Sequence, residues 1–248
     1  MILLYIFAAL LGLRLLFVLL LGICALFVNP KREYEKNNRF YRFILDSATA
    51  AAMKLLRIRV HISGIEKIPK DEKVLFVSNH RSNFDPIVTW YALKKWKIAF
   101  VSKPENFKVP FFGRIIRKCC FLPIDRENPR KAIVTINKAA KLLKEQEVSI
   151  GIYPEGTRSK SCQLLPFHNG VFKIAQKAHS PIVVLSICGT EEIAKQTPFT
   201  PTDVYLDVLE VFPGENIKEM KTEIIGMMVR HLIATNIEKR DAIWQKDM

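Results

Sequence analysis

The stretch VLFVSNHRSNFDP, residues 74–86, decides the fold. Its first four residues are apolar and branched or aromatic, which is typical of a short buried strand. Asp85 and Pro86 predict the start of a helix, because Asp is favoured at the N-cap and Pro at the first helical position. A strand followed by a loop and a helix indicates an α/β fold, in which ligands bind at the carboxyl edge of the sheet. We therefore expect His80, which lies in this loop, at that edge.

His80 and Asp85 are candidates for acid–base chemistry. They are five residues apart, and on a continuous helix five steps of about 100° would separate their side chains by about 140°. A turn between a strand and a helix can bring them together. A carboxylate bonded to one imidazole nitrogen fixes the tautomer and raises the basicity of the other nitrogen, so the pair predicts a general base. The alternative at this point is that Asp85 only caps its helix and His80 is a polar turn residue.

Outward from this stretch, apolar runs alternate with segments of helical periodicity. The runs expected to form strands are 56–62, 74–77, 98–101, 119–124, 148–153, 182–187 and 204–211. The segments expected to form helices between and after them are 86–96, 110–117, 129–145, 169–178 and 217–239. This alternation predicts an α/β domain over residues 59–248, with a mostly parallel, mixed sheet of about seven strands flanked by helices.

The N-terminal part of the chain has a different character. Residues 2–28 are apolar except for Arg14. About 20 such residues can cross a bilayer as a helix, but a cation near the middle favours a tilted or shallow position. We expect residues 1–58 to form a membrane-anchoring pair of helices, the second over 35–55, and leave open whether the first one spans. The alternative for the second helix is that it packs on the domain.

Basic residues follow the apolar segment immediately, between positions 31 and 42. By the positive-inside rule, the rest of the chain is expected on the cytoplasmic face of the cell membrane. The whole chain has 38 Lys and Arg against 24 Asp and Glu, a formal net charge of +14. Such a surface attracts anionic lipids, acidic proteins or nucleic acid. Nucleic acid is disfavoured, because no recognised binding motif is present and the aromatic residues fall in apolar runs.

The cysteines and histidines predict neither a disulfide framework nor a metal site. Five cysteines are present, no C-x-x-C occurs, and Cys119 and Cys120 would point to opposite faces of the strand expected there. Reduced, buried thiols are expected instead. The histidines are scattered without the spacing of metal ligands, so we predict no metal and no cofactor.

Charged residues follow the expected strands at one edge of the sheet. Lys103 follows the strand at 98–101, Arg126 the strand at 119–124, and Arg158 the strand at 148–153. Arg binds phosphate through a planar fork and Lys binds it as a point charge. Each cation alone is typical of a solvated loop residue. Because the loops of parallel strands share one edge, the three together predict a cleft for a phosphate-bearing substrate beside His80.

These motifs resemble the blocks of the glycerolipid acyltransferases, specifically the 1-acylglycerol-3-phosphate (lysophosphatidic acid) acyltransferases. The resemblance covers roughly residues 60–190 and rests on Asn79-His80-x4-Asp85, on Lys103 through Phe111-Phe112-Gly113 to Pro123-Ile124-Asp125-Arg126-Glu127, on Tyr153-Pro154-Glu155-Gly156-Thr157-Arg158-Ser159 and on Pro181-Ile182-Val183-Val184. The chain departs from the family at His168, where a Lys is usual, and in the fourth block, which lacks a second proline.

The resemblance implies a function. His80, oriented by Asp85, would deprotonate the free sn-2 hydroxyl of lysophosphatidic acid, which would attack an acyl thioester on coenzyme A or acyl carrier protein and give phosphatidic acid. No G-x-S-x-G is present, so direct transfer without an acyl-enzyme is expected. The implied phosphate-binding residues are Lys103, Arg126, Thr157 and Arg158, with Glu155 and Gly156 shaping their pocket.

Two other functions remain open from the sequence. The chain could acylate another lysolipid, for example a lyso-ornithine lipid, in which case the arginines would matter less. It could also be a non-catalytic membrane protein that binds anionic lipids through its net charge of +14. Substitution of His80 separates the second alternative from an enzyme, because lipid binding does not need a general base.

Overall fold

The computed structural model describes residues 5, 12, 19, 22–197 and 199–247. Its centre is a seven-stranded sheet with the order β1-β7-β6-β2-β5-β3-β4. The strands are β1 (Ile58–Ser63), β2 (Leu75–Ser78), β3 (Ile98–Ser102), β4 (Leu122–Pro123), β5 (Ser149–Ile152), β6 (Ile182–Cys188) and β7 (Thr202–Phe212). Strands β6, β2, β5, β3 and β4 are parallel, β7 pairs antiparallel with β6, and β1 pairs parallel with β7. The expected mixed sheet of an α/β fold is confirmed.

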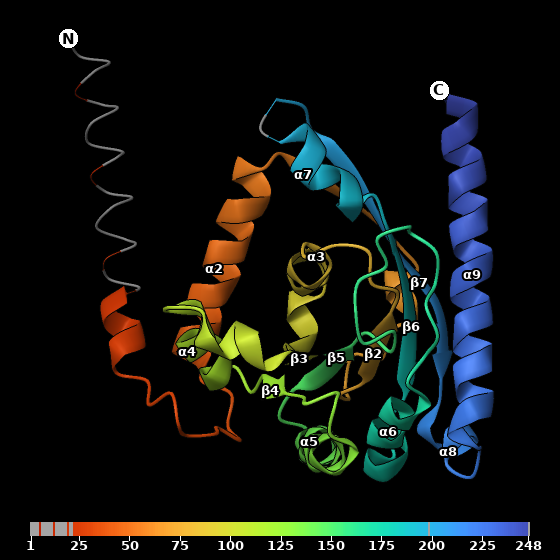
Figure 1. The fold of residues 1–248 in the computed structure, drawn as a ribbon, viewed down its shortest axis with the longest axis horizontal. Helices are drawn as coiled ribbons and strands as arrows, with labels where there is room; N and C mark the ends of the chain where they lie inside the picture. The colour runs from red at the N-terminus through yellow and green to blue at the C-terminus, as the bar shows by residue number, and fades with distance from the viewer. Residues whose placement is uncertain (1–4, 6–11, 13–18, 20–21, 198, 248) are drawn as a thin grey trace.

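Helices cover both faces of the sheet. They are α2 (Arg39–Leu55), α3 (Asp85–Ala92), α4 (Phe112–Lys118), α5 (Pro129–Lys144), α6 (Lys173–Ala178), α7 (Ile193–Gln196), α8 (Gly214–Ile217) and α9 (Thr222–Asp247). Figure 1 shows α9 on one side of the sheet and α2 and α4 on the other. Helix α5 begins where the sequence predicts it, and the side chain of Asn128 caps it by accepting a hydrogen bond from the amide of Lys131.

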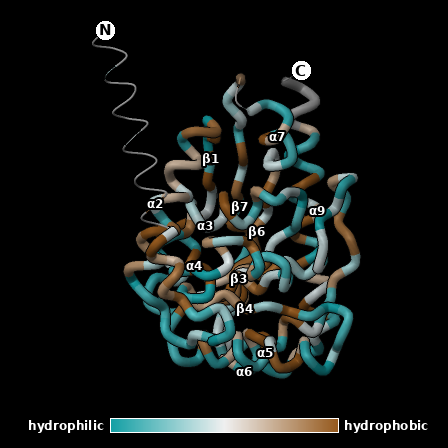
Figure 2. The backbone as a smooth tube through the Cα atoms, turned by 60° about the vertical axis from the view of Figure 1, so that its left-hand side comes forward, coloured by the Kyte–Doolittle hydropathy of each residue, from teal (hydrophilic) through white to brown (hydrophobic). Residues whose placement is uncertain are grey.

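Successive residues of β2 enter two different cores. Leu75 and Val77 pack in a cluster with α5, α6 and α9, whereas Phe76 packs in a cluster with α2, α3 and α4. Side chains alternate across a strand, so an uninterrupted apolar run fits a strand that is covered on both faces. Figure 2 shows the hydrophobic segments gathered around β3 at the centre of the molecule.

The strand expected at 119–124 is wrong in its extent. Cys119 is the C-cap of α4, and Cys120 adopts a φ of 64°. The amide of Cys119 donates to the carbonyl of Ile116, so this apolar run folds largely as a buried turn, and only Leu122–Pro123 pair as a strand. The two thiols are buried there, and burial raises the pKa of each to about 12.

The helix expected at 35–55 is present as α2, and it packs on the domain. Asn38 caps it by accepting hydrogen bonds from two amides of its first turn. The buried guanidinium of Arg42 donates to the carbonyls of Ile98 at 3.1 Å and Cys119 at 3.2 Å. It also lies 4.6 Å from the centroid of the Trp90 ring. These contacts tie α2 to the sheet and to α3.

The apolar segment expected as a membrane helix over residues 2–28, together with Arg14, falls mostly outside the described residues. In the part of the chain that the structure does describe, no helix combines the length and the apolarity needed to cross a bilayer.

Candidate active site

A histidine and a buried carboxylate form a pair in the loop between β2 and α3. Nδ1 of His80 lies 2.7 Å from Oδ2 of Asp85, which is fully buried. The same carboxylate oxygen accepts hydrogen bonds from the backbone amides of Arg81 and Ser82, each at 2.7 Å. Oδ1 accepts a hydrogen bond from the hydroxyl of Thr190. These donors compensate the buried negative charge, and the carboxylate in turn fixes the orientation of the imidazole.

The role predicted for Asp85 as an N-cap is wrong. Helix α3 begins at Asp85 itself, and its N-cap is Phe84, which makes no side-chain capping bond. The side chain of Asp85 turns back to amides of the preceding loop, an alternative that short polar side chains readily take. Of the two interpretations of this stretch, the His80–Asp85 contact is the one that the structure contains.

The imidazole of His80 stacks on an aromatic ring at the end of β5. The centroids of His80 and Tyr153 are 4.3 Å apart with an interplanar angle of 18°, and Tyr153 is parallel to Phe100 at 5.9 Å. Gly151 makes room for this arrangement, because a Cβ there would lie 2.5 Å from a ring carbon of Phe100. Burial raises the pKa of Tyr153 well above its ordinary value, so the phenol stays neutral beside the imidazole.

The motif Tyr153–Ser159 holds the backbone of His80 from both sides. Glu155 is buried and accepts hydrogen bonds from the amide of His80 at 2.7 Å and from the amide of Leu165 at 2.9 Å. The amide of Ser159 donates to the carbonyl of His80 at 2.8 Å. Burial raises the pKa of Glu155, while the two backbone hydrogen bonds act in the opposite direction. Glu155 therefore supports the histidine loop and does not line the cleft beside it.

His80 opens into a cleft of about 420 Å³ that polar and apolar side chains line to a similar extent. The charged and hydroxyl side chains that line it include His80, Lys103, Arg126, Thr157 and Arg158. Burial lowers the pKa of the Arg126 guanidinium, with the nearby carboxylate of Glu105 opposing. Only 14% of the His80 side chain is exposed, and among the described residues no hydrogen bond engages its Nε2. The cleft thus presents one free imidazole nitrogen together with three cations.

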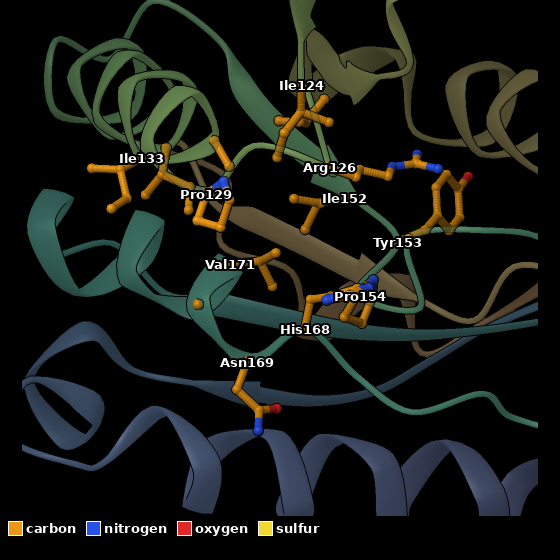
Figure 3. A pocket seen from close by; sticks show the side chains of 15 residues that line it. Ile124, Arg126, Pro129, Ile133, Ile152, Tyr153, Pro154, His168, Asn169 and Val171 are labelled. Carbon is orange, nitrogen blue, oxygen red and sulfur yellow. The ribbon is translucent and has the colours of Figure 1, made fainter.

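A second cavity of about 400 Å³ lies next to the cleft and is largely apolar. Its lining includes Ile124, Ile133, Ile136, Ile152 and Val171, and it shares Arg126 and Tyr153 with the cleft. Figure 3 shows the side chains of Ile124, Ile152 and Val171 around this cavity, with the side chain of Arg126 extending toward Tyr153 at one end.

The predicted site residues fall into three groups. His80, Lys103, Arg126, Thr157 and Arg158 line one cleft, and Asp85 lies behind His80. Gly156 lines the apolar cavity, where two features favour glycine: its φ of 70°, and the His168 ring, which would lie 2.9 Å from any Cβ at this position. Glu155 is buried beneath the histidine loop.

Sequence reasoning missed residues that act on this site from neighbouring strands. Thr190 contacts Asp85 from the turn after β6, and Tyr153 stacks on His80. Asn79 bridges to β6, with its side chain donating to the carbonyl of Ile187 and accepting from its amide, both at 2.8 Å. The position of Thr190 after a strand was the one available signal, because loops that follow parallel strands share an edge.

No metal centre accompanies this arrangement in the described part of the chain, where no group of three His, Cys, Asp or Glu side chains could hold an ion. Cys162 follows the motif Tyr153–Ser159 in the chain. Its Sγ donates to Glu191 at 3.7 Å, and burial raises its pKa. A thiol of this kind is a weak nucleophile at neutral pH.

The comparison with protein families defines the class. The model of the family described as Acyltransferase matches residues 59–188, which include the whole of the cleft described above. The chain belongs to the acyltransferase family.

Particular relatives are named more narrowly. The chain is similar to the 1-acyl-sn-glycerol-3-phosphate acyltransferase of Limnanthes douglasii, with 32% identity over 54% of this chain and 46% of the relative. The Haemophilus influenzae protein of the same name is 34% identical over 47% of this chain and 50% of the relative. The chain thus spans about half the length of these curated relatives. The crystal structure of the 1-acyl-sn-glycerophosphate (LPA) acyltransferase PlsC from Thermotoga maritima matches with a TM-score of 0.68 and 25% identity, over 82% of this chain and 81% of that one.

Proposed function

We propose that the protein transfers an acyl chain from an acyl thioester to the sn-2 hydroxyl of lysophosphatidic acid and releases phosphatidic acid. The observation that carries the proposal is the shared cleft, in which the free side of His80 faces the same space as Lys103, Arg126 and Arg158. A base beside three cations suits an acceptor that carries both a hydroxyl and a phosphate. The names of the similar proteins support the same substrate.

In the proposed reaction His80 is the general base. Its Nε2 removes the proton of the acceptor hydroxyl, and Asp85 stabilises the imidazolium through Nδ1. The alkoxide attacks the thioester carbonyl, the carbon–sulfur bond breaks, and the thiolate leaves and is protonated by the imidazolium. Coenzyme A and acyl carrier protein are both suitable thiols. The proposed reaction needs no cofactor and forms no acyl-enzyme, and the raised pKa of Cys162 is consistent with the absence of an acyl-enzyme.

The apolar cavity next to the cleft is the proposed site of an acyl chain. It reaches the cleft at Arg126 and Tyr153 and is lined by aliphatic side chains of α5 and β5. An acyl chain in this cavity would place its thioester or its polar headgroup near His80 and its hydrocarbon tail away from water. Each methylene buried in this way contributes about 0.8 kcal/mol to binding.

The site is proposed to work at the cytoplasmic face of the cell membrane, with residues 1–58 as the membrane-associated part and residues 59–248 as the catalytic domain. Support comes from exposed aromatic side chains at the N-terminal side, among them Phe27, Phe40 and Phe43 with 81%, 54% and 67% of their surface exposed. A net charge of +14 favours an anionic lipid surface as well.

The experiment that tests the proposal is acyl transfer by the purified protein in lipid vesicles, with labelled acyl thioester and lysophosphatidic acid. We expect His80→Ala to abolish product. Arg158→Ala should raise the KM for the acceptor by about 10- to 100-fold, because a hydrogen-bonded charge pair contributes about 1.5–3 kcal/mol. Lys144→Ala, at the C-terminal end of α5, is the matched loss of a surface cation and should leave both kcat and the KM for the acceptor unchanged.

Transfer that survives His80→Ala would overturn the assignment of the base. Absence of transfer with either thioester, by folded wild-type protein, would overturn the acceptor, and lyso-ornithine lipid would be tried next. Vesicle binding without transfer to any lysolipid would instead favour the non-catalytic lipid-binding function.

A further inference from the structure

The turn that follows β6 reaches the His80–Asp85 pair. At Gly189 the chain takes a φ of 88°, which an L side chain rarely adopts, and a short 3-10 helix follows at Thr190–Glu192. This conformation brings Thr190, which is fully buried, against Asp85. The two residues are 105 positions apart in the chain, so the contact depends on the neighbouring positions of β2 and β6 in the sheet.

Two further contacts fix the turn to the histidine loop. Nη1 of Arg81 donates to Oε1 of Glu191 at 2.8 Å, and only 3% of the Arg81 side chain is exposed. Asn79 makes its paired hydrogen bonds with the backbone of Ile187 near the end of β6. Because these links lie on either side of the contact between Thr190 and Asp85, the threonine hydroxyl has little freedom to move away.

The two carboxylate oxygens of Asp85 are supported unequally. Oδ2 receives His80 and two backbone amides, whereas Thr190 is the only donor to Oδ1 among the described residues. The terminal torsion of an aspartate is broad and soft. A donor on Oδ1 therefore sets the plane of the carboxylate, and that plane sets the direction of the bond from Oδ2 to the imidazole.

We propose that Thr190 is a positioning residue of the catalytic pair, whose hydroxyl fixes the Asp85 carboxylate and through it the orientation and basicity of His80. The inference deepens the proposed acyl transfer and rests on it for its catalytic consequence. Thr190 does not line the cleft, so its effect on the reaction passes through Asp85.

The sign of the effect on His80 follows from the carboxylate. Without the hydroxyl, Oδ1 has no donor, the negative charge is less delocalised into hydrogen bonds, and it attracts the imidazolium more strongly. The other titratable groups that face the pair are Tyr153 and Glu155 from β5 and its loop, Arg81 from the histidine loop and Glu191 from the turn, with the cleft cations in front. A single change at Thr190 leaves all of them in place.

The test compares Thr190→Val, which removes only the hydroxyl, with Thr190→Ser, which retains it. Acyl transfer is measured against pH, and the titration of His80 is followed by NMR in protein with 15N-labelled histidine, assigned with His80→Asn. Thr202→Val is the matched control, because the hydroxyl of Thr202 is also buried but has no hydrogen-bond partner among the residues that the structure describes. Thr190→Ala serves if the valine variant does not fold.

For Thr190→Val we expect kcat to fall about 10- to 100-fold, as for a slightly misplaced base, while the KM for the acceptor is unchanged. The acid limb of the kcat/KM profile and the His80 titration should both move to higher pH. Thr190→Ser should restore all of these, and Thr202→Val should match the wild type.

Wild-type behaviour of His80 in folded Thr190→Val would overturn the inference, and so would an equal loss of kcat in the valine and serine variants. An inactive wild type would instead refute the proposed function. The NMR titration would still decide the role of Thr190 in that case, because it needs no substrate.

Discussion

At the scale of single residues, Asp85 is a fully buried carboxylate that binds four hydrogen-bonding groups of the protein. A fully buried carboxylate with four donors has no place for an amide of the same shape, because an NH2 group would face one of those donors. Asp85→Asn should therefore lower kcat by about 10³- to 10⁴-fold, as expected when the histidine loses the group that fixes its tautomer.

The measurement is kcat with lysophosphatidic acid, next to thermal unfolding of the same preparation. Asp71→Asn, at an exposed position, is the control for removal of a negative charge. A folded Asp85→Asn protein with more than about a tenth of wild-type activity would contradict the role given to the pair.

The sequence was sufficient to predict the charged residues that line the cleft, together with Asp85, and insufficient for the contacts of Thr190 and Tyr153 and for the orientation of Glu155. His80, Lys103, Arg126 and Arg158 follow strands, and the rule that parallel strands end at one edge brings them together. Glu155 lies in the same kind of loop, but its carboxylate turns inward to the amide of His80. Such a choice depends on which backbone amides are left without partners nearby, and one sequence does not contain that information.

At the scale of elements, α9 is anchored to the sheet by one buried acid. Asp207 of β7 accepts hydrogen bonds from Ser63 of β1 and from Asn236 and Arg240 of α9. Burial alone would raise the pKa of Asp207, but the hydrogen bonds of these three side chains outweigh it and keep the pKa below the usual value of 3.8.

An acid whose pKa is lowered on folding stabilises the protein above its unfolded pKa, and that stabilisation is lost as the pH falls through the folded pKa. Asp207→Asn should lower the free energy of unfolding at pH 7 by about 2 kcal/mol. Urea unfolding across pH measures this, and the gap between variant and wild type should close as the pH falls below 3.8. A gap that is constant with pH would contradict the electrostatic origin.

The exposed aromatic side chains of α2 give a prediction for membrane contact. Phe40 and Phe43 are more than half exposed although α2 packs on the domain through Arg42. The double variant Phe40→Ser and Phe43→Ser should lower binding to anionic vesicles about tenfold or more, because each ring contributes about 1.5–3 kcal/mol when fully buried in an apolar phase. Vesicle sedimentation measures the change.

Met227→Ser is the matched control, since Met227 is 65% exposed and α9 lies on the opposite side of the sheet (Figure 1). Equal losses from both substitutions would show that apolar surface in general, and not the face of α2, drives binding.

Elements were predictable where a local signal marks their ends. Asn128 before Pro129 marks the start of α5, which begins at residue 129 as expected, whereas α2 begins at Arg39 and not at residue 35, because Asn38 caps it. The run at 119–124 has the composition of a strand. Most of it instead forms the C-cap of α4 and the turn that follows this helix. An apolar residue is buried equally well in either conformation, so hydrophobicity could not separate them.

At the scale of the whole molecule, two cavities of similar size meet at one edge of the sheet. Ile133 of α5 lines the apolar cavity and is 55% exposed, so a larger side chain there can fill space without disturbing the core. Ile133→Trp should shift the preferred acyl chain to shorter lengths. A chain that loses contact for two methylenes loses about 1.6 kcal/mol, or about tenfold in kcat/KM.

A series of acyl thioesters of increasing length provides the measurement. Val134→Trp is the control, because Val134 is 51% exposed on the same helix but is not among the residues that line the cavity. An unchanged length profile in Ile133→Trp would place the acyl chain elsewhere.

Arg126 belongs to both cavities. Any substitution there would change the proposed headgroup site and the entrance of the proposed acyl-chain site at once, whereas Lys103 and Ile133 each line only one of the two. Selection for a different acceptor at position 126 would therefore also change the preference for acyl-chain length, and the reverse holds as well. Changes that affect only one property should therefore accumulate at positions that line only one cavity. Substitutions of Arg126 should change acceptor preference and preferred acyl-chain length together.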